Sequence, residues 1–286
     1  MRIGLYSCCV TMEEISSLDI YDEFREEIQA IFRSRLLTQM LVALGSGAKS
    51  LSDLRDITGS SSQALIPKIR QLESAHYIES ERGDYVLTPL GRIVEPEIER
   101  LVTLMGVLQR HRDFWTQHDI ESIPAEMLKE IGDLYSSEVV RDVEENIFAV
   151  YTTFLNLLQN AKWIHAVSSI MSPAHAEAMM GTVRHGKSVE LVISADLADT
   201  LIADPYSTML RSLEDCHDFR IYVSPVPVRL GMTVTDSCLS LGLYKRGTDA
   251  YDTSVDLISF DATANAWGER LFQYYRQVSE PLVYDP

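Results

Sequence analysis

The stretch KSLSDLRDITGSSSQALIPKIRQLESAHYIESERGDYVLT, residues 49–88, decides the fold of the first part of the chain. Ser50 and Asp53 have the spacing of a capping box, which predicts the start of one helix. Gly59 is the residue type that commonly ends a helix. The serines at 60–62 can cap a second helix. The apolar positions of that second helix recur at helical spacing; they are Leu65, Ile69 and Leu72.

The end of the same stretch predicts a β-hairpin. Residues 77–80 and 85–88 alternate as strands around Glu81-Arg82-Gly83-Asp84, with Gly83 where a positive φ is needed. Helix, turn, helix and hairpin in this order are the core of a winged helix-turn-helix, a module that places one helix in a DNA major groove. The alternative is a helical hairpin and a β-hairpin that only pack together.

The first helix that this module requires is predicted over residues 35–44, after a possible cap at Ser34 and before Gly45-Ser46-Gly47. Residues 13–32 predict a leading amphipathic helix. Pro67 opposes a regular second helix, because proline costs about 3 kcal/mol in a helix interior. We therefore expect that helix to start late, near Gln63, or to be kinked.

Length and composition indicate a larger protein than one winged helix. With 286 residues and 46% hydrophobic residues, the chain predicts a second globular domain of roughly 160 residues. No apolar run approaches the roughly 18 residues that span a bilayer, and the N-terminus lacks the pattern of a secretory signal. These features predict a cytoplasmic protein. The four cysteines (Cys8, Cys9, Cys216 and Cys238) lack metal-ligand spacing. Residues 1–11 differ in character from the helical region after them, which suggests that translation begins at Met12.

Charge is unevenly distributed along the chain. The formal net charge is −17, yet residues 33–92 hold eight Lys and Arg against six Asp and Glu, a net charge of +2. The remainder therefore carries −19. A mildly basic module on an acidic body is compatible with DNA binding, because distribution matters more than total charge. High intracellular salt is another possible reason for the acidity.

After the hairpin, a long helical stretch is predicted from Thr88 to about Trp115, interrupted at Pro96. Its apolar seam is Ile93, Ile98, Leu101, Val102, Met105 and Leu108. A helix that leaves a winged module with such a seam commonly pairs with its twin in dimeric regulators. The alternative is that the seam packs on the chain's own second domain.

The second part of the chain predicts an α/β domain with a mixed sheet. Helices are expected over 123–134 and 136–161, and strands and helices then alternate up to a closing helix over 262–278. The later strands are separated by short connections, which indicates antiparallel pairing. The expected domains are an N-terminal extension (1–21), the winged helix-turn-helix (22–92), a linker or dimerisation helix (93–118) and an α/β regulatory domain (119–286).

No catalytic constellation is complete. The sequence lacks GxGxxG after a strand, a Walker loop, GxSxG and HExxH. His185-Gly186-Lys187 matches the opening of the phospholipase D motif HxKx4D, but Val192 stands where the aspartate should be. An acidic set could in principle hold a hard cation but is better read as a solvated loop; it comprises Asp249, Asp252, Asp256 and Asp261. We predict no enzyme activity, no cofactor and no metal.

Several segments together resemble a known family. They are FRSRLLTQMLVAL (32–44), residues 49–73 and the hairpin, YVLTPLGRIV (85–94), RDFWTQHDIESIPAEMLKEIGDLYSS (112–137), LLQNAKWIHAVSSI (157–170), HDFRIYVSP (217–225) and VDLISFDATANAWGERLFQYY (255–275). The chain resembles the archaeal winged-helix regulators that carry the methanogenesis regulatory protein sensor domain behind an ArsR-like DNA-binding domain. The resemblance implies a transcriptional regulator of a methanogen, with a C-terminal domain that senses a metabolite or mediates assembly. It also implies a degenerate phospholipase D-like architecture for that domain, and supplies no ligand residues.

We therefore predict a dimeric, sequence-specific regulator that binds double-stranded DNA and a small-molecule effector, away from membranes. The predicted DNA-binding residues are Ser60, Ser61, Ser62, Gln63, Lys68, Arg82, Arg33, Arg35 and Lys49. Gln63 suits a bidentate contact to adenine, and Lys68 suits guanine or phosphate. The alternatives are an enzyme that uses its winged helix only for dimerisation, and a scaffold whose acidic body binds partners.

Overall fold

The computed structural model describes residues 15–213, 216 and 218–283. The chain divides into two compact units, one ending at Glu99 and the other beginning at Arg100. In the described part, no helix is both long and apolar enough to cross a membrane. Three predictions fall outside that part: those on Cys8, Cys9 and Met12.

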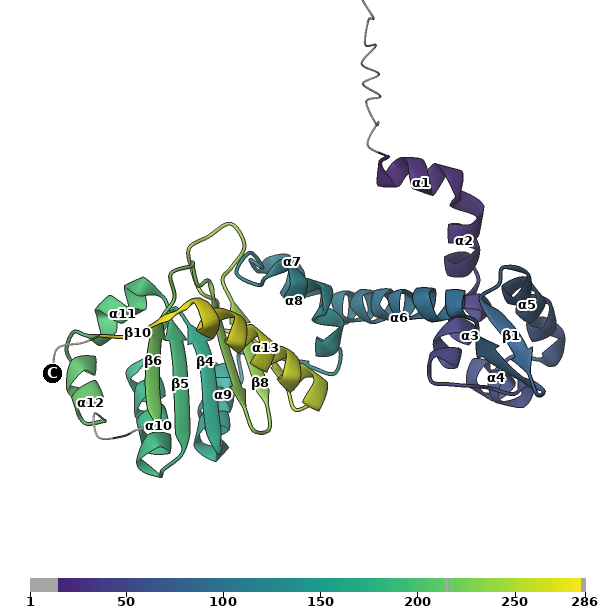
Figure 1. Ribbon diagram of the computed structural model, residues 1–286. Helices are drawn as coiled ribbons and strands as arrows, with labels where there is room; N and C mark the ends of the chain where they lie inside the picture. The colour runs from purple at the N-terminus through teal and green to yellow at the C-terminus, as the bar shows by residue number, and fades with distance from the viewer. Residues whose placement is uncertain (1–14, 214–215, 217, 284–286) are drawn as a thin grey trace, which may run out of the picture. The chain divides into compact units, whose positions relative to one another are not determined.

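Unit 1 includes three helices followed by an antiparallel hairpin, in the predicted order and close to the predicted positions (Figure 1). Its elements are α1 (Ser17–Glu23), α2 (Arg25–Arg33), α3 (Arg35–Gly45), α4 (Leu51–Thr58), α5 (Ser62–Ser74), β1 (Ile78–Glu81), β2 (Asp84–Leu87) and the start of α6 (Pro89–Arg110). Apolar side chains of α3, α4, α5 and both strands form one core. Burial of that core holds the module together, since each element is too short to be stable alone.

The predicted helix signals of this unit act as expected. Ser50 Oγ accepts the N–H of Asp53 at 3.1 Å, and the Asp53 carboxylate accepts the N–H of Ser50 at 2.8 Å. Hydrogen bonds from the backbone and the hydroxyl of Ser50 lower the pKa of Asp53. Gly59 ends α4 at φ 63°, a left-handed conformation that favours glycine. Ser61 caps α5 by accepting the N–H of Ala64 at 3.3 Å.

One prediction about these helices is wrong. The single helix over 13–32 is divided, in its described part, into α1 and α2 at Phe24, where ψ is 24°. The apolar period continues across this break, so nothing in the pattern marks it. The second helix, α5, begins at Ser62, one residue before the predicted start near Gln63, and holds Pro67 as its sixth residue. Buried Leu65 and Ile69 on either side anchor the helix, and packing overrides propensity.

The interruption predicted at Pro96 is also wrong. Helix α6 continues through Pro96 to Arg110, and the break comes at His111, before α7 (Arg112–Gln117). Glu95 and Ile98, close to the proline, are both buried. The packing of these side chains holds the helix across a residue that removes one backbone hydrogen bond.

Unit 2 contains the predicted mixed sheet. Its further elements are α8 (Ala125–Lys129), the 3-10 helix η1 (Ile131–Leu134), β3 (Glu138–Arg141), α9 (Ala149–Asn160), β4 (Trp163–Ser168), α10 (Pro173–Arg184), β5 (Ser188–Ile193), α11 (Ala195–Leu201), α12 (Tyr206–Arg211), β6 (Phe219–Val223), β7 (Leu230–Thr235), β8 (Leu239–Leu243), β9 (Val255–Ser259), α13 (Ala262–Val278) and β10 (Glu280–Pro281). The strand order is β10-β6-β5-β4-β7-β8-β9-β3. Strands β4, β5 and β6 run parallel, and the other pairs are antiparallel.

Two helix predictions in this unit need correction. The helix over 123–134 is instead the short α8 and then η1. Only the second half of the helix over 136–161 forms, as α9, because residues 138–141 pair with β9 as an edge strand. Val139 and Val140 are β-branched residues that suit a strand, and their spacing happened to continue the helical seam of α9.

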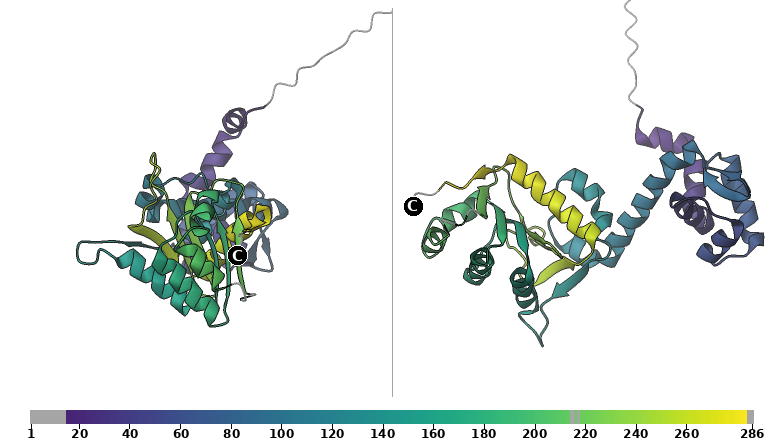
Figure 2. Two further views of the ribbon diagram at one scale, coloured as in Figure 1. Left: turned by 90° about the vertical axis from the view of Figure 1, so that its left-hand side faces the viewer. Right: turned by 60° about the horizontal axis from the view of Figure 1, so that its bottom comes forward.

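Helices cover both faces of this sheet (Figure 2). Helix α13 packs on one face through four fully buried residues: Trp267, Leu271, Phe272 and Tyr275. Helices α9 and α10 lie on the other face, toward which Ile164 and Ala166 of β4 point. Side chains along a strand alternate between faces, so the same central strands supply both cores. The face under α9 and α10 also contains the large pocket of this unit.

Candidate functional sites

The outer face of α5 is exposed and polar. Four exposed residues recur at helical spacing on the side opposite the buried Leu65 stripe: Gln63, Pro67, Arg70 and Ser74. Lys68 lies at the flank, where its Nζ donates to Gln71 Oε1 at 3.1 Å. Arg70 is thus better placed than Lys68 for a partner that meets the outer face of α5. The set predicted from sequence omits Arg70, although helical spacing from Gln63 could have identified it.

The hairpin turn is tighter than predicted and carries a cation at its tip. Glu81 pairs with Asp84, so only Arg82 and Gly83 form the turn, at φ 55° and 97°. Two successive positive φ values are typical of the two-residue type I′ turn. The side chain of Arg82 is exposed. Lys49 joins the hairpin to the start of α4, because its backbone N–H donates to Tyr85 O at 3.1 Å.

The structure brings some of the other predicted residues together at the start of α5. Arg35 Nη2 donates to Ser60 Oγ at 3.2 Å, which places the first turn of α3 beside the serines that precede α5. Ser61 is the cap and Ser62 the first residue of α5. Lys49 is half-buried and its Nζ donates to Gly47 O at 3.4 Å.

Arg33 completes the predicted set. It is the exposed last residue of α2 and directly precedes Ser34, the cap of α3. Its place in a DNA interface stays a prediction.

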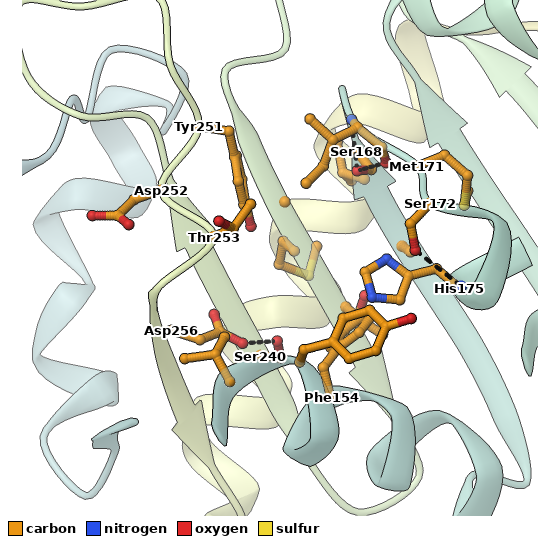
Figure 3. Close-up of a pocket in the computed structure, with 18 of the residues that line it drawn as sticks. Phe154, Ser168, Met171, Ser172, His175, Ser240, Tyr251, Asp252, Thr253 and Asp256 are labelled. Atoms are coloured by element: carbon orange, nitrogen blue, oxygen red, sulfur yellow. Dashed lines mark hydrogen bonds between the residues drawn. The ribbon is translucent and has the colours of Figure 1, made fainter. Parts of the chain in front are cut away.

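A pocket of about 790 Å³ opens on the face of the sheet beneath α9 and α10 (Figure 3). This volume is in the range of sites for small molecules. Its lining is mainly apolar and comes from α9, α10, β4, β5, β7, β8, β9 and the loops beside them. Ile147 and Phe148 line it from the loop before α9 and are 60% and 62% exposed, which places them at its rim.

One wall of the pocket depends on a pair of glycines. Gly231 of β7 and Gly242 of β8 are directly paired across the two strands. The phenol of Tyr251 lies over this pair, and a Cβ at either glycine would collide with the Tyr251 hydroxyl oxygen. Glycine at both positions therefore makes room for the ring. Burial raises the pKa of Tyr251 well above its usual value, with Asp256 contributing in the same direction.

Asp256 is a buried carboxyl group on this wall. Its side chain is on β9 and the residue is 5% exposed. Asp256 Oδ2 accepts from Ser240 Oγ at 2.5 Å, whereas Oδ1 has no hydrogen-bond partner among the described residues. Burial raises the pKa of Asp256 to about 7, against the lowering effects of the Ser240 hydroxyl and of the backbone N–H of Leu257. The remaining oxygen can accept a hydrogen bond from a bound molecule.

His175 of α10 lies on the side of the pocket opposite Asp256 and Ser240 (Figure 3). Its ring is 5.2 Å from the ring of Tyr151 and 4.9 Å from that of Phe154, measured between centroids. Burial lowers the pKa of His175, which favours the neutral imidazole. His175 Nε2 also lacks a partner in the described part of the chain.

Residues of the incomplete phospholipase D motif and of the acidic set have structural roles. Lys187 Nζ donates to Ala161 O at 2.6 Å, and His185 Nδ1 lies 2.6 Å from Gly181 O, at the end of α10. The predicted acidic set is not a cluster, since Asp249 pairs with Arg229 at 2.6 Å and Asp261 caps α13. No group of three or more potential metal ligands occurs among the described residues. Cys216 and Cys238 are free thiols.

Two family models match the chain, one in each part. Residues 25–106 match the N-terminal domain of methanogenesis regulatory protein FilR1, and residues 147–278 match its middle domain. The methanogenesis regulatory protein FilR1 of Methanothrix harundinacea (strain 6Ac) is 29% identical over 260 residues, which are 90% of this chain and 58% of that protein. The chain thus spans little more than half the length of this relative.

Among solved structures, TrmBL2, described as an archaeal chromatin protein, matches 91% of this chain and 100% of its own at 14% identity and a TM-score of 0.41. The phospholipase D family member Nuc from Salmonella typhimurium matches 52% of this chain and 99% of its own, at 14% identity and a TM-score of 0.40. At these values the phospholipase D-like architecture stays a prediction. The family models and the relative are both named as a regulatory protein. The chain is therefore similar to the N-terminal domain of methanogenesis regulatory protein FilR1 over residues 25–106 and to its middle domain over residues 147–278.

Proposed function

We propose that the chain is a DNA-binding transcriptional regulator whose unit 1 is a winged helix-turn-helix of the ArsR-like type. The observation that carries this proposal is the outward face of α5 in a unit whose hairpin carries Arg82 at its tip. A helix with outward amide and guanidinium groups suits the base edges of a major groove, and a cation on a hairpin suits the backbone or the minor groove. The similarity to a protein named as a regulatory protein supports the same function.

Each group has a role that follows from its position. The free N–H groups at the start of α5, with Ser60, Ser61 and Ser62, suit a phosphate. Gln63 suits adenine and Arg70 suits guanine, because both side chains lie on the outer face and can form bidentate contacts. The remaining cations suit phosphates and set affinity more than specificity; they are Arg33, Arg35, Lys49 and Lys68.

Dimerisation is the second part of the proposal. Leu101 and Met105 of α6 are 40% and 50% exposed, and their spacing of four residues places them on one face of the helix. An exposed apolar stripe on the helix after the hairpin suits pairing with the same helix of a second copy. Leu101→Glu together with Met105→Glu is expected to convert a dimer into a monomer in sedimentation velocity, while the same double change to Gln should weaken the dimer less.

Unit 2 is then the regulatory part, which binds a small-molecule effector in the pocket beneath α9 and α10. The mainly apolar lining and the two polar side chains with free hydrogen-bonding atoms, Asp256 and His175, are features of a site for an organic molecule. We place the protein in the cytoplasm, where DNA and metabolites are both accessible.

An electrophoretic mobility shift on the DNA upstream of its own gene tests the proposal. Gln63→Ala should cost roughly 1–3 kcal/mol of binding and relax the preference at one base position. Arg82→Ala should weaken all sites alike and reduce the slope of log affinity against log salt by about one. Arg211→Ala removes the same charge from the exposed surface of α12 and serves as the control. Unchanged binding in both test variants would exclude α5 and the hairpin from the DNA interface.

A further inference from the structure

The charges that line the pocket are all of one sign. Its lining includes three carboxyl groups, those of Asp142, Asp252 and Asp256, and neither Lys nor Arg occurs among the described lining residues. A carboxylate or phosphate would enter this space without a cation to pair with, which is costly away from water. The lining therefore disfavours anionic ligands and favours neutral or cationic ones.

Two of these carboxyl groups are already engaged by the protein. Asp142 Oδ1 accepts the backbone N–H of Val150 at 3.0 Å. Asp252 Oδ1 accepts from both the N–H and the hydroxyl of Ser254, at 3.0 and 2.6 Å, while its Oδ2 lies 3.3 Å from His118 Nε2. Figure 3 shows the carboxyl group of Asp252 pointing away from the residues that surround the pocket. Both groups are thus less suited than Asp256 to hold a ligand.

Asp256 is different, because one of its oxygens is buried and unused. Oδ2 accepts from Ser240, and Oδ1 has no partner among the described residues although the residue is 5% exposed. An unpaired buried acceptor costs about 1–3 kcal/mol, which a donor on a bound molecule can offset. An ammonium group provides both the donor and the opposite charge.

The remainder of the lining suits a cation that carries an apolar body. Tyr151, Phe154 and Tyr251 contribute aromatic rings to the lining, and aromatic faces attract ammonium groups. Met171 and Met179 add flexible apolar surface that adapts to an alkyl or aryl group. The volume of about 790 Å³ accommodates a molecule much larger than a metal ion or a water.

We propose that the pocket of unit 2 binds an organic ammonium compound, with its charged group on Asp256 Oδ1 and its apolar part against the aromatic and methionine side chains. The proposal rests on the regulatory role of unit 2 proposed above, for which it supplies the chemical class of the effector. Neutral alcohols of the same shape bind more weakly because they do not compensate the charge of the carboxylate.

Binding of an ammonium ion to this site depends on the ionisation of Asp256. Burial raises the pKa of Asp256 to about 7, so the carboxylate population rises between pH 6 and 8. Tyr251 and Cys238 also interact electrostatically with Asp256, and the pKa values of both are raised. These two groups therefore stay neutral over this range, and binding should strengthen with rising pH because of Asp256.

The test is calorimetric titration of the full chain with a series of amines from methylammonium to 2-phenylethylammonium at pH 8. The matched probes are 2-phenylethanol, which is neutral, and 3-phenylpropanoate, which is anionic. We expect one or more of the amines to bind, with an affinity roughly ten times or more that of the matching alcohol. The anionic 3-phenylpropanoate should not bind. Asp256→Asn should lower the binding affinity of that amine by roughly 10- to 100-fold, as expected for the loss of a charge-assisted hydrogen bond.

Asp199→Asn is the matched control, since Asp199 is exposed on α11 away from the lining residues. Tryptophan fluorescence of each variant verifies that unit 2 is folded. Absence of binding by every amine, equal binding of amine and alcohol, or unchanged affinity in Asp256→Asn would each overturn the proposal. The titration contains no DNA and the mobility shift contains no amine, so failure of the ligand class and failure of the DNA-binding function are separate results.

Discussion

Replacement of Asp256 by Asn should change the pH dependence of stability in unit 2. The pKa of Asp256 is raised from 3.8 to about 7 by burial. A folded-state pKa above the unfolded value means that the folded chain binds more protons between these pH values, so this carboxyl group destabilises the folded state progressively as pH rises from about 4 to 7. At about 1.4 kcal/mol for each unit of pKa difference, the accumulated cost is roughly 4 kcal/mol above pH 7.

Urea unfolding monitored by tryptophan fluorescence measures this effect in the right unit, because all three tryptophans (Trp115, Trp163 and Trp267) belong to unit 2. The difference in free energy of unfolding between Asp256→Asn and the unchanged chain should grow in favour of the variant from pH 4 to 7 and stay constant above. Asp199→Asn, at an exposed position of α11, is the control for removal of one carboxyl group. A constant difference for Asp256→Asn over pH 4–8 would refute the reasoning, whatever its size.

Three further substitutions test individual contacts. Arg70→Ala should weaken DNA binding more than Lys68→Ala in a mobility shift, because the Lys68 ammonium is bonded to Gln71 at the flank of the helix; the reverse order would place the flank of α5 at the DNA. Gly242→Ala should destabilise unit 2 by roughly 1–3 kcal/mol in urea unfolding, since the new methyl group collides with Tyr251, and a neutral effect would contradict the close approach. Pro67→Ala should raise the unfolding temperature of unit 1 by circular dichroism, because it restores an N–H in a helix interior; an unchanged or lower temperature would show that the proline is accommodated at no cost.

Local signals predicted most of unit 1. The Ser50 and Asp53 capping box, the left-handed Gly59 and the turn around Gly83 are short-range features, and each is determined by residues within four positions. One error, the interruption predicted at Pro96, came from tertiary packing. Pro67 and Pro96 both lie inside helices, because buried neighbours stabilise the helical conformation more than proline disfavours it.

Strand β3 of unit 2 also could not be predicted from local sequence patterns. Its residues continue the apolar spacing of α9, and only pairing with β9, more than a hundred residues later in the chain, makes them a strand. Helical and strand periods cannot be told apart over so few residues. Alternation of strands and helices was enough to predict a mixed sheet, but the order of its strands depends on contacts that no local pattern contains.

The pocket could not be predicted from sequence because its polar groups are dispersed. Asp256 and His175 are 81 positions apart, on β9 and α10, and no motif joins them. The sequence did contain one usable signal, the glycines at 231 and 242 inside two apolar strands. Glycine weakens a strand interior, so a pair of them indicates that another group approaches the sheet closely. Here that group is the Tyr251 ring, which holds one wall of the pocket beside Asp256. The pocket proposed to bind the effector is thus marked in the sequence by two residues that lack side chains, so a search for catalytic side chains did not find it.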